Sequence, residues 1–315
     1  MKLEIERVTY RFREPVQTAF GALAERSVLV VRAGDGVGEA APLEPYDGVS
    51  LDDAQRALEG RDEMVPQAAA ALDIAAWDAR GRASGEPVAA LLGDPLEAVP
   101  VNATIVPTDR AGASRAAAEA VAAGFRCLKL KVGVGDDAGR LAAARAAVGP
   151  DVALRIDANG AWSVDEAIAA LRSLAPVGIE LCEEPVHGVE ALRAVRAAVD
   201  VPVAMDETAR EPGALASGAA DAVCLKVSAQ GGIRPLLEAA RSARAAGSDV
   251  YLASTFDGPV GIAAALHAAA ALRVTRSCGL ATLGLFADVE DPFPPRDGAI
   301  AVPGGPGLGL PASRR

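Results

Sequence analysis

The feature that most constrains the fold is a series of short apolar runs that recur at regular intervals through the middle of the chain. The runs end at Lys131, Asp157, Glu183, Asp206 and Lys226, which are separated by 26, 26, 23 and 20 residues. Each interval is long enough for one strand and one crossover helix. Consecutive units of this kind form a parallel sheet, and this chain is therefore predicted to contain a β/α barrel.

Alternation within the runs places their charged residues on one face. Successive side chains of a strand point to opposite faces, so Lys129 and Lys131 share a face that is opposite to Leu128 and Leu130. A solvated face would also explain two lysines, but the acidic strand ends that follow favour a common site. The C-terminal ends of barrel strands form a single mouth, where these charged residues are expected to meet.

The chain divides into three predicted parts. Residues 1–95 form a smaller α+β domain with strands at 3–11, 27–33 and from 37, a flexible loop at 14–24, and helices at 51–58 and 64–84. Residues 96–285 form the barrel, with strands at 99–106, 126–132, 153–157, 179–183, 203–206, 222–227, 250–254 and 277–283. Residues 286–315 are a tail, rich in proline and glycine, that packs back on the first domain.

Charge and composition limit the class of partner. The 42 acidic residues outnumber the 31 basic ones, and the net charge of −11 argues against binding to nucleic acid or an anionic membrane. No secretory signal and no apolar run of transmembrane length is visible. The four cysteines lie in or beside apolar runs without a CxxC pair, which is typical of a reducing, cytoplasmic compartment. A small-molecule partner is expected, and the oligomeric state stays open.

Several motifs together resemble the enolase superfamily over nearly the whole chain. They are Lys129-x-Lys131, Asp157-Ala-Asn159, Glu183-Glu-Pro185, Asp206-Glu207, Lys226, Ser254 near the seventh strand end, and Pro306-Gly-Leu-Gly309 in the tail. The resemblance implies an α/β fold: a (β/α)7β TIM-like barrel with an N-terminal α+β capping domain completed by the C-terminal tail. Lysines on both sides of the site are typical of the group that resembles muconate lactonising enzyme.

The resemblance also implies roles for individual residues. Asp157, Glu183 and Asp206 would be the ligands of Mg²⁺, with Mn²⁺ able to substitute, and Lys131 and Lys226 would be the acid/base pair. Physical chemistry agrees, because two carboxylates at about 4 Å repel by up to ~4 kcal/mol at an effective dielectric constant of about 20. Oxygen ligands suit Mg²⁺ before zinc. The alternative is that these acids only pair with neighbouring lysines and arginines.

Within that group, the short loops and the Asp206-Glu-Thr sequence are most similar to o-succinylbenzoate synthases. The implied activity is that of a hydro-lyase of menaquinone biosynthesis, which acts on a carboxylate substrate. Lys131 would remove a ring proton, and Lys226 would be a cation near the enolate. The pKa of a lysine base must fall from about 10.4 to about 7 or 8, and Lys129 and Mg²⁺ supply positive charge in that direction.

Two alternatives within the group stay open, because N-succinylamino acid racemases and dipeptide epimerases would use the same residues. In either of these enzymes, Lys131 and Lys226 would both act as bases, one on each face of the substrate. The sequence alone does not separate these activities from dehydration.

Other residues are predicted to contact the substrate or to orient the ligands: Lys129, Arg155, Asn159, Glu184, Glu207, Ser254, Phe20 and Gly21. Phe20 and Gly21 lie in a capping loop that could close over the substrate, although a surface loop would look the same. Asn159 could equally be a turn residue, and Ser254 could lie in an ordinary βα loop. His187 and His267 are the only histidines, and neither has a motif around it.

Two alternatives come from other classes of protein. Gly133-Val-Gly-Asp-Asp-Ala138 follows a strand and opens a helix, and Asp157 lies 24 residues after Gly133, which imitates an NAD-binding fingerprint. However, its strand carries two lysines on one face, and further acidic strand ends follow. No organic cofactor is therefore expected. A non-catalytic binding module is the second alternative, which loss of turnover on mutation of Lys131 or Asp157 would exclude.

Overall fold

A curled parallel sheet of seven strands forms the centre of the chain. The computed structural model describes residues 3–18, 21–60, 62, 64–105, 109–133 and 135–311. The strands are, in spatial order, β5 (Ala103–Ile105), β6 (Cys127–Lys131), β7 (Ala153–Asp157), β8 (Ile179–Glu183), β9 (Val203–Met205), β10 (Ala222–Leu225) and β11 (Asp249–Leu252). The predicted α/β barrel with a capping domain is confirmed.

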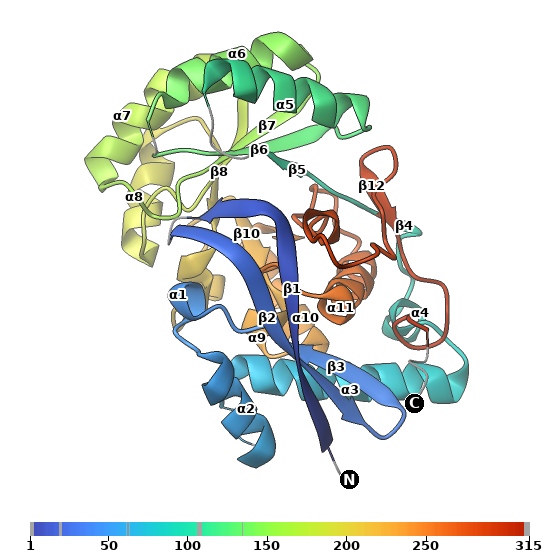
Figure 1. Ribbon diagram of the computed structural model, residues 1–315. Helices are drawn as coiled ribbons and strands as arrows, with labels where there is room; N and C mark the ends of the chain where they lie inside the picture. The colour runs from blue at the N-terminus through green and yellow to red at the C-terminus, as the bar shows by residue number, and fades with distance from the viewer. Residues whose placement is uncertain are drawn as a thin grey trace.

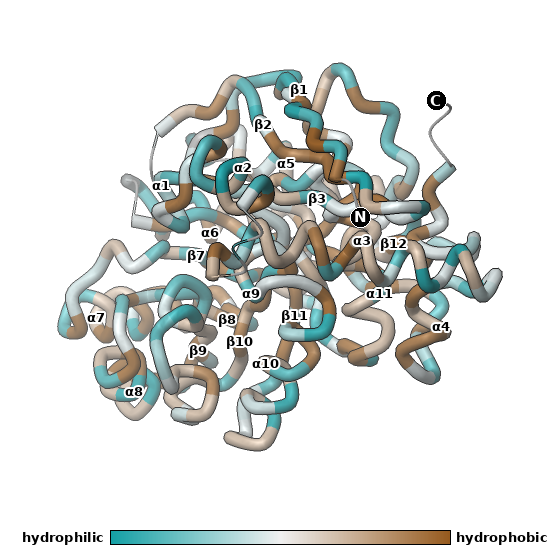
Figure 2. The backbone as a smooth tube through the Cα atoms, turned by 90° about the horizontal axis from the view of Figure 1, so that it is seen from below, coloured by the Kyte–Doolittle hydropathy of each residue, from teal (hydrophilic) through white to brown (hydrophobic). Residues whose placement is uncertain are grey.

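Helices cover the outer face of this sheet, as Figure 1 shows for α5 to α8 beside β6 to β8. They are α5 (Arg110–Ala122), α6 (Asp137–Val148), α7 (Val164–Leu174), α8 (Val189–Ala198), α9 (Val227–Gln230), α10 (Ile233–Ala245) and α11 (Pro259–Ala271). The apolar residues that alternate with the charged ones pack beneath them, and Leu128, Leu130, Leu154 and Ile156 are fully buried. In Figure 2, β10 and β11 carry apolar colouring, whereas α8 and α10 are mixed.

Two bridging residues close the barrel. The backbone N–H of Cys278 donates to Pro100 (2.8 Å), and that of Gly279 donates to Leu252 at the end of β11 (2.8 Å). The predicted eighth strand at 277–283 is therefore wrong in length. Beyond these residues the chain turns into a 3₁₀-helix, η4 (Leu283–Leu285), which brings Phe286 onto Phe12 with 4.8 Å between the ring centroids.

The capping domain joins a three-stranded antiparallel sheet to four helices. Its elements are β1 (Leu3–Thr18), β2 (Gly21–Ala33), β3 (Gly36–Ala40), α1 (Glu44–Asp47), α2 (Leu51–Gly60), α3 (Pro66–Ser84) and α4 (Val88–Leu92). The predicted loop at 14–24 is wrong where the structure describes it, because β1 and β2 continue through it as a hairpin. The strand register shifts between Arg11 and Val16, around Pro15, which has no N–H to donate.

Strand β3 lies directly on α3 through two glycines. A β-carbon on Gly36 would be 2.0 Å from the carbonyl oxygen of Ala75, and one on Gly38 would be 1.9 Å from that of Ala71. Both neighbours are backbone atoms, so no rotation of a side chain can relieve the overlap. These glycines therefore set the distance between the sheet and the helix.

We expect Gly38→Ala to destabilise the protein by about 1–3 kcal/mol, because the strand must move away from α3. Differential scanning calorimetry would measure this as a lower Tm. The matched control is Gly60→Ala at the end of α2, where no atom lies within 4 Å of the added β-carbon. A Tm of Gly38→Ala equal to that of Gly60→Ala would contradict this packing.

Two carboxylates of the capping domain cap helices of the barrel. Glu39 Oε1 on β3 accepts from Gly258 N at the start of α11 (2.7 Å). Asp73 Oδ2 on α3 accepts from Ile233 N at the start of α10 (2.7 Å). Each carboxyl oxygen is a partner for a backbone N–H group that the start of a helix leaves unpaired. Burial, followed by the charge of Asp257, raises the pKa of Glu39 to about 8.

The tail packs on the start of the barrel and on the capping domain. Strand β12 (Ala299–Ala301) pairs antiparallel with β4 (Ala98–Pro100). Further along, Gly307 N donates to Glu86 O (2.9 Å) and Gly307 O accepts from Val88 N (2.8 Å). Leu308 N donates to Asp78 Oδ1 on α3 (2.8 Å). None of the helices in the described ranges is long and apolar enough to span a membrane.

Candidate active site

Strand register brings the predicted charged residues into a row at the C-terminal end of the barrel. Lys131 on β6 is the register partner of Asp157 on β7, which is in turn the partner of Glu183 on β8. Asp206 directly follows β9, and Lys226 directly follows β10. The structure therefore brings together all five residues, which are 20 to 26 residues apart in the sequence.

Ion pairs link the carboxylates to the lysines. Asp157 Oδ2 accepts from Lys131 Nζ (2.6 Å) and from Lys129 Nζ (3.0 Å), and Lys129 also donates to Glu183 Oε1 (2.9 Å). Lys226 pairs with Asp206. Burial alone would raise the pKa of Asp157, but Lys129 and Lys131 outweigh it and hold this pKa below its ordinary range. These carboxylates are therefore partly neutralised by the lysines.

The type of cation at this site is itself informative. Of the 31 basic residues in the sequence only four are lysines, and three of them, Lys129, Lys131 and Lys226, meet here. Arginine remains protonated in proteins, whereas lysine can release a proton when its surroundings lower its pKa. A chain that otherwise uses arginine has lysine where proton transfer would need it. The low number of lysines is visible in the sequence and is independent of the spacing and alternation of the strand residues.

The donor atoms fit a hard divalent cation. Carboxylate oxygens of Glu183 and Asp206 and the sulfur of Cys224 lie within 4.8 Å of one another. Burial raises the pKa of the Cys224 thiol well above its ordinary value, so oxygen is the better donor here. Asp157 lies outside that close group and is held by two lysines. Carboxylates on neighbouring strand ends are typical ligands of Mg²⁺.

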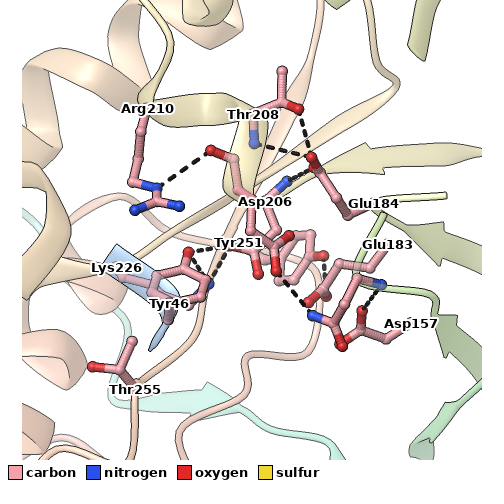
Figure 3. A network of polar contacts seen from close by, with 12 residues as sticks. Tyr46, Asp157, Glu183, Glu184, Asp206, Thr208, Arg210, Lys226, Tyr251 and Thr255 are labelled. Atoms are coloured by element: carbon pink, nitrogen blue, oxygen red, sulfur yellow. Dashed lines mark hydrogen bonds and ion pairs between the residues drawn. The ribbon is translucent and has the colours of Figure 1, made fainter. Parts of the chain in front are cut away.

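Glu184 fixes the position of Asp206. Its side chain is buried, and it accepts from Asp206 N (2.7 Å), Thr208 N (3.0 Å) and Thr208 Oγ1 (2.5 Å). His187 Nδ1 lies 3.0 Å from the same carboxylate. Figure 3 shows Glu184 directed at the turn that follows β9. The carboxylate therefore ties the end of β8 to the start of that turn.

Asn159 connects Lys131 to Glu207. Asn159 Oδ1 accepts from Lys131 Nζ, and Asn159 Nδ2 donates to Glu207 Oε1 (2.9 Å). Glu207 Oε2 is buried without a hydrogen-bond partner among the described residues. Burial, followed by the charge of Asp206, raises the pKa of Glu207 to about 8. The side-chain amide of Asn159 therefore contacts Lys131 directly, and the carboxyl group of Glu207 contacts that amide.

Arg155 lies one layer below the mouth. It donates to Glu180 Oε2 (2.5 Å) and to Ser277 O (2.6 Å), and its guanidinium carbon is 4.9 Å from the ring centroid of Tyr251. Tyr251 donates to Glu183 Oε2 (2.6 Å). Arg155 thus reaches Glu183 through the tyrosine and forms its own ion pair with Glu180. Alternation along β11 could have identified Tyr251 as facing inward.

The site residues that were predicted in loops are Ser254, Phe20 and Gly21, and the contacts given for Ser254 and Gly21 are not with the charged residues of the site. Ser254 Oγ lies 3.0 Å from Thr282 Oγ1, and Ser254 N donates to Gly279, so its contacts join strand ends of the barrel. Gly21 begins β2 at the hairpin, where its carbonyl accepts from Thr18 Oγ1 (2.8 Å). Phe20 lies outside the described residues.

Tyr46 of the capping domain is a site residue that the sequence analysis missed. Its hydroxyl donates to Asp206 Oδ1 (3.0 Å) and accepts from Lys226 Nζ (3.0 Å), and the same ammonium is 4.7 Å from the ring centroid. Figure 3 shows the three side chains together. Tyr46 comes from α1, and no periodicity within the capping domain indicates which residue lies over the barrel.

A cavity of 520 Å³ opens over these residues. Its lining includes Tyr46, which contacts Lys226, and Asn159, which contacts Lys131. The cavity therefore lies next to one contact residue of each lysine, and neither lysine is in its lining. Its other lining residues include His187, Glu207, Thr208, Arg210 and Glu211.

The glycine loop after β6 does not resemble a nucleotide cradle in its contacts. Gly133 N donates to Asp137 Oδ2 (2.7 Å), and Gly139 N donates to Asp136 Oδ1 (3.1 Å). These N–H groups, which a pyrophosphate would require, are satisfied by aspartates of the following helix.

Comparison with known families assigns both parts of the chain. Residues 112–314 match the model of the enolase C-terminal domain-like family, and residues 47–93 match the N-terminal domain of mandelate racemase and muconate lactonizing enzyme. The chain belongs to the enolase superfamily. Membership confirms the predicted family and replaces the dinucleotide-binding alternative.

Relatives within the superfamily have different enzyme names. The chain is 35% identical to the o-succinylbenzoate synthase of Thermobifida fusca (strain YX), over 92% of this chain and 86% of that protein. It is 34% identical to that of Mycolicibacterium smegmatis (strain ATCC 700084 / mc(2)155), over 91% and 83%. Among solved structures, the L-Ala-D/L-Glu epimerase from Bacillus subtilis has a TM-score of 0.88 at 28% identity, covering 98% and 97% of the two chains.

A second solved neighbour is the N-succinyl Arg/Lys racemase from Bacillus cereus ATCC 14579. Its TM-score is 0.89 at 26% identity, and the alignment covers 98% of this chain and 94% of that one. The fold of this chain is thus shared by enzymes with different reactions. Its sequence is more similar to the synthases than to these solved structures.

Proposed function

We propose that the chain catalyses the Mg²⁺-dependent dehydration of 2-succinyl-6-hydroxy-2,4-cyclohexadiene-1-carboxylate to o-succinylbenzoate, a step of menaquinone biosynthesis. The sequence similarity to o-succinylbenzoate synthases over 92% of the chain supports the substrate. The arrangement of Lys131, Asp157, Glu183, Asp206 and Lys226 around one mouth supports the chemistry. The reaction removes one proton from the carbon next to a carboxylate and then loses hydroxide, which leaves an aromatic ring.

Lys131 is the proposed base. Its neutral amine takes the ring proton, and the resulting ammonium then gives a proton to the departing hydroxide, so that water leaves and the lysine returns to its starting state. Asn159 and Asp157 hold the amine in place through their contacts with Nζ. Lys131 lines the open side of the site, with 22% of its side chain exposed, and substrate can reach it there.

Asp157, Glu183 and Asp206 are the proposed ligands of Mg²⁺. A divalent cation held there supplies stabilisation of the negative charge that develops on the substrate carboxylate. Lys129 is proposed to lie behind the ligands, because it already bridges Asp157 and Glu183. Glu184 is proposed to orient Asp206 through its backbone N–H.

The difference between the two lysines is the observation that favours dehydration over racemisation. Lys226 is enclosed by Asp206 and Tyr46, with only 7% of its side chain exposed, whereas 22% of the Lys131 side chain is exposed. Dehydration needs one lysine that moves protons and one fixed cation. Racemisation needs two lysines that both move protons. N-succinylamino acid racemase or dipeptide epimerase activity is the second candidate, which the solved neighbours favour.

A spectrophotometric assay with Mg²⁺ and the cyclohexadiene substrate tests the proposal, run beside N-succinyl amino acids and dipeptides followed by polarimetry. Rapid loss of diene absorbance with no change of optical rotation is the expected result. Slow dehydration with rapid racemisation or epimerisation would assign the protein to the second candidate function. If neither the diene absorbance nor the optical rotation changed, both candidate functions would be excluded.

We expect Glu184→Gln to weaken binding of Mg²⁺ roughly 10–100-fold. Both carboxylate oxygens of Glu184 accept backbone N–H groups, and an amide can accept through only one end. The N–H of Asp206 or Thr208 is then buried without an acceptor, at a cost of about 1–3 kcal/mol, and Asp206 loses its anchor. Titration of Mg²⁺ against activity and calorimetry would measure the change.

The matched control for this change is Glu190→Gln on α8. Glu190 is exposed, and its one ion pair in the described part of the chain is with Arg193, so its amide should leave the affinity for Mg²⁺ unaltered. Equal affinities of wild type and Glu184→Gln would show that Glu184 does not orient a ligand.

We also propose the division of the chain into a capping domain (1–95), a barrel (96–285) and a tail (286–315). The bridge between Pro87 and Gly307 supports a tail that belongs with the capping domain. A cytoplasmic location is part of the proposal, supported by four buried cysteines that form no disulfide.

A further inference from the structure

The guanidinium of Arg210 has few polar contacts within the described part of the protein. Its Nε donates weakly to the backbone of Glu207 (3.4 Å), and its side chain is exposed. Within the described ranges no carboxylate forms an ion pair with it. Two edges of the guanidinium therefore remain available for an anion.

Tyr46 supports this guanidinium from below. The guanidinium carbon of Arg210 lies 4.6 Å from the centroid of the tyrosine ring. A planar guanidinium stacks well on an aromatic face and keeps its N–H groups free in the plane. Figure 3 shows Arg210 on the other side of Asp206 from Glu183 and Asp157. The stacking therefore holds a free cation at the rim, next to a tyrosine that contacts Asp206 and Lys226.

The cavity has an uneven distribution of charge. Arg210 is the only lysine or arginine in its described lining, at the edge, while Glu207 lines it near the acids of the site. The proposed substrate carries two carboxylates. One belongs to the ring carbon that loses its proton and must lie near Lys131. The second ends the succinyl tail, and Arg210 is the cation of the described lining that can receive it.

We infer that Arg210, held in place by Tyr46, binds the distal carboxylate of a dicarboxylate substrate at the rim of this cavity. The inference rests on the proposed function and adds a specificity determinant to it. A guanidinium can donate two parallel hydrogen bonds to a carboxylate, which gives both affinity and orientation. Glu211 also lines the cavity and carries the opposite charge beside this position. It should weaken binding of the same carboxylate.

Equilibrium binding of two ligands tests the inference without turnover. The first is the product o-succinylbenzoate, and the second is 2-butanoylbenzoate, in which a methyl group replaces the distal carboxylate. For Arg210→Gln we expect the Kd of o-succinylbenzoate to rise roughly tenfold to hundredfold, and that of 2-butanoylbenzoate to stay within about twofold. In steady-state kinetics, KM for the dehydration substrate should rise by a similar factor, with a smaller change of kcat.

Three further variants sharpen the test. Arg80→Gln is the matched control, because Arg80 is also exposed and also stacks on an aromatic ring, that of Trp77 on α3 (5.2 Å). It should bind both ligands as wild type does. Glu211→Gln should bind o-succinylbenzoate more tightly, because it removes a like charge. Arg210→Lys should recover part of the lost affinity.

The inference would be overturned if Arg210→Gln weakened both ligands equally, or if its Kd for o-succinylbenzoate matched that of Arg80→Gln. An equal loss of affinity for the two ligands would mean that Arg210 affects the shape of the cavity and does not bind the distal carboxylate. These outcomes are independent of the proposed reaction. A wild-type protein that bound o-succinylbenzoate but failed to dehydrate the diene would overturn the proposed function and leave the result for Arg210 intact.

Discussion

Replacing Lys131 by alanine should lower kcat by roughly 10²–10⁴-fold, while the protein keeps its fold. Among the residues that the structure describes, no other amine lies on the open side of the site, because Lys226 is enclosed and Lys129 lies behind two carboxylates. Initial rates with the cyclohexadiene substrate would measure the loss. Thermal melting would verify that the variant is folded.

Lys131→Arg separates the base from the charge. Arginine can keep the ion pair with Asp157, but its guanidinium does not give up a proton near neutral pH. We expect this variant to be nearly as inactive as Lys131→Ala. Substantial turnover by Lys131→Arg would mean that the site needs only a cation here, and the assignment of the base would be wrong.

Removal of divalent cations should stop turnover, and addition of Mg²⁺ should restore it. The proposed ligands of the cation are the buried carboxylates Asp157, Glu183 and Asp206. Without the cation, the negative charge that develops on the substrate would have no counter-charge there. Chelation should also lower the Tm, because a ligand that binds only the folded state stabilises it by about 2.7 kcal/mol at a hundredfold excess over its Kd. Activity after dialysis against chelator, and melting with and without Mg²⁺, are the measurements.

Asp206→Asn is the companion variant for the metal. It keeps the size of the side chain and its contact with Tyr46, but it removes one negative charge from the site. We expect it to need more Mg²⁺ for half-maximal activity. Full activity of the wild type after exhaustive chelation would refute the metal site altogether.

Repetition made the barrel and its charged row predictable from the sequence. Each unit contributes one strand, and the last residue of each strand must lie at the same end, so that Lys131, Asp157 and Glu183 fall in register without any knowledge of their contacts. The parity of β6 likewise placed Lys129 on the face of Lys131, where it bridges two of the acids.

Contacts that depend on the packing of separate parts could not be predicted in this way. Tyr46 reaches Asp206 because α1 of the capping domain lies over the barrel mouth, and no local pattern encodes that placement. The proposed role of Arg210 could not be predicted for the same reason, because it depends on stacking on Tyr46, which belongs to the capping domain. The eighth strand was overestimated because an apolar run beside a turn looks like a strand, whereas only Cys278 and Gly279 form its bridges.

The carboxylates that cap α10 and α11 restrict how this scaffold can be recombined. Asp73 and Glu39 belong to the capping domain, yet they accept from backbone N–H groups at the starts of two helices of the barrel. A chimera that joins this barrel to the capping domain of another superfamily member should therefore keep a hydrogen-bond acceptor at both positions. Exchange of substrate-binding loops, in contrast, leaves these caps in place and is the better route to new specificity.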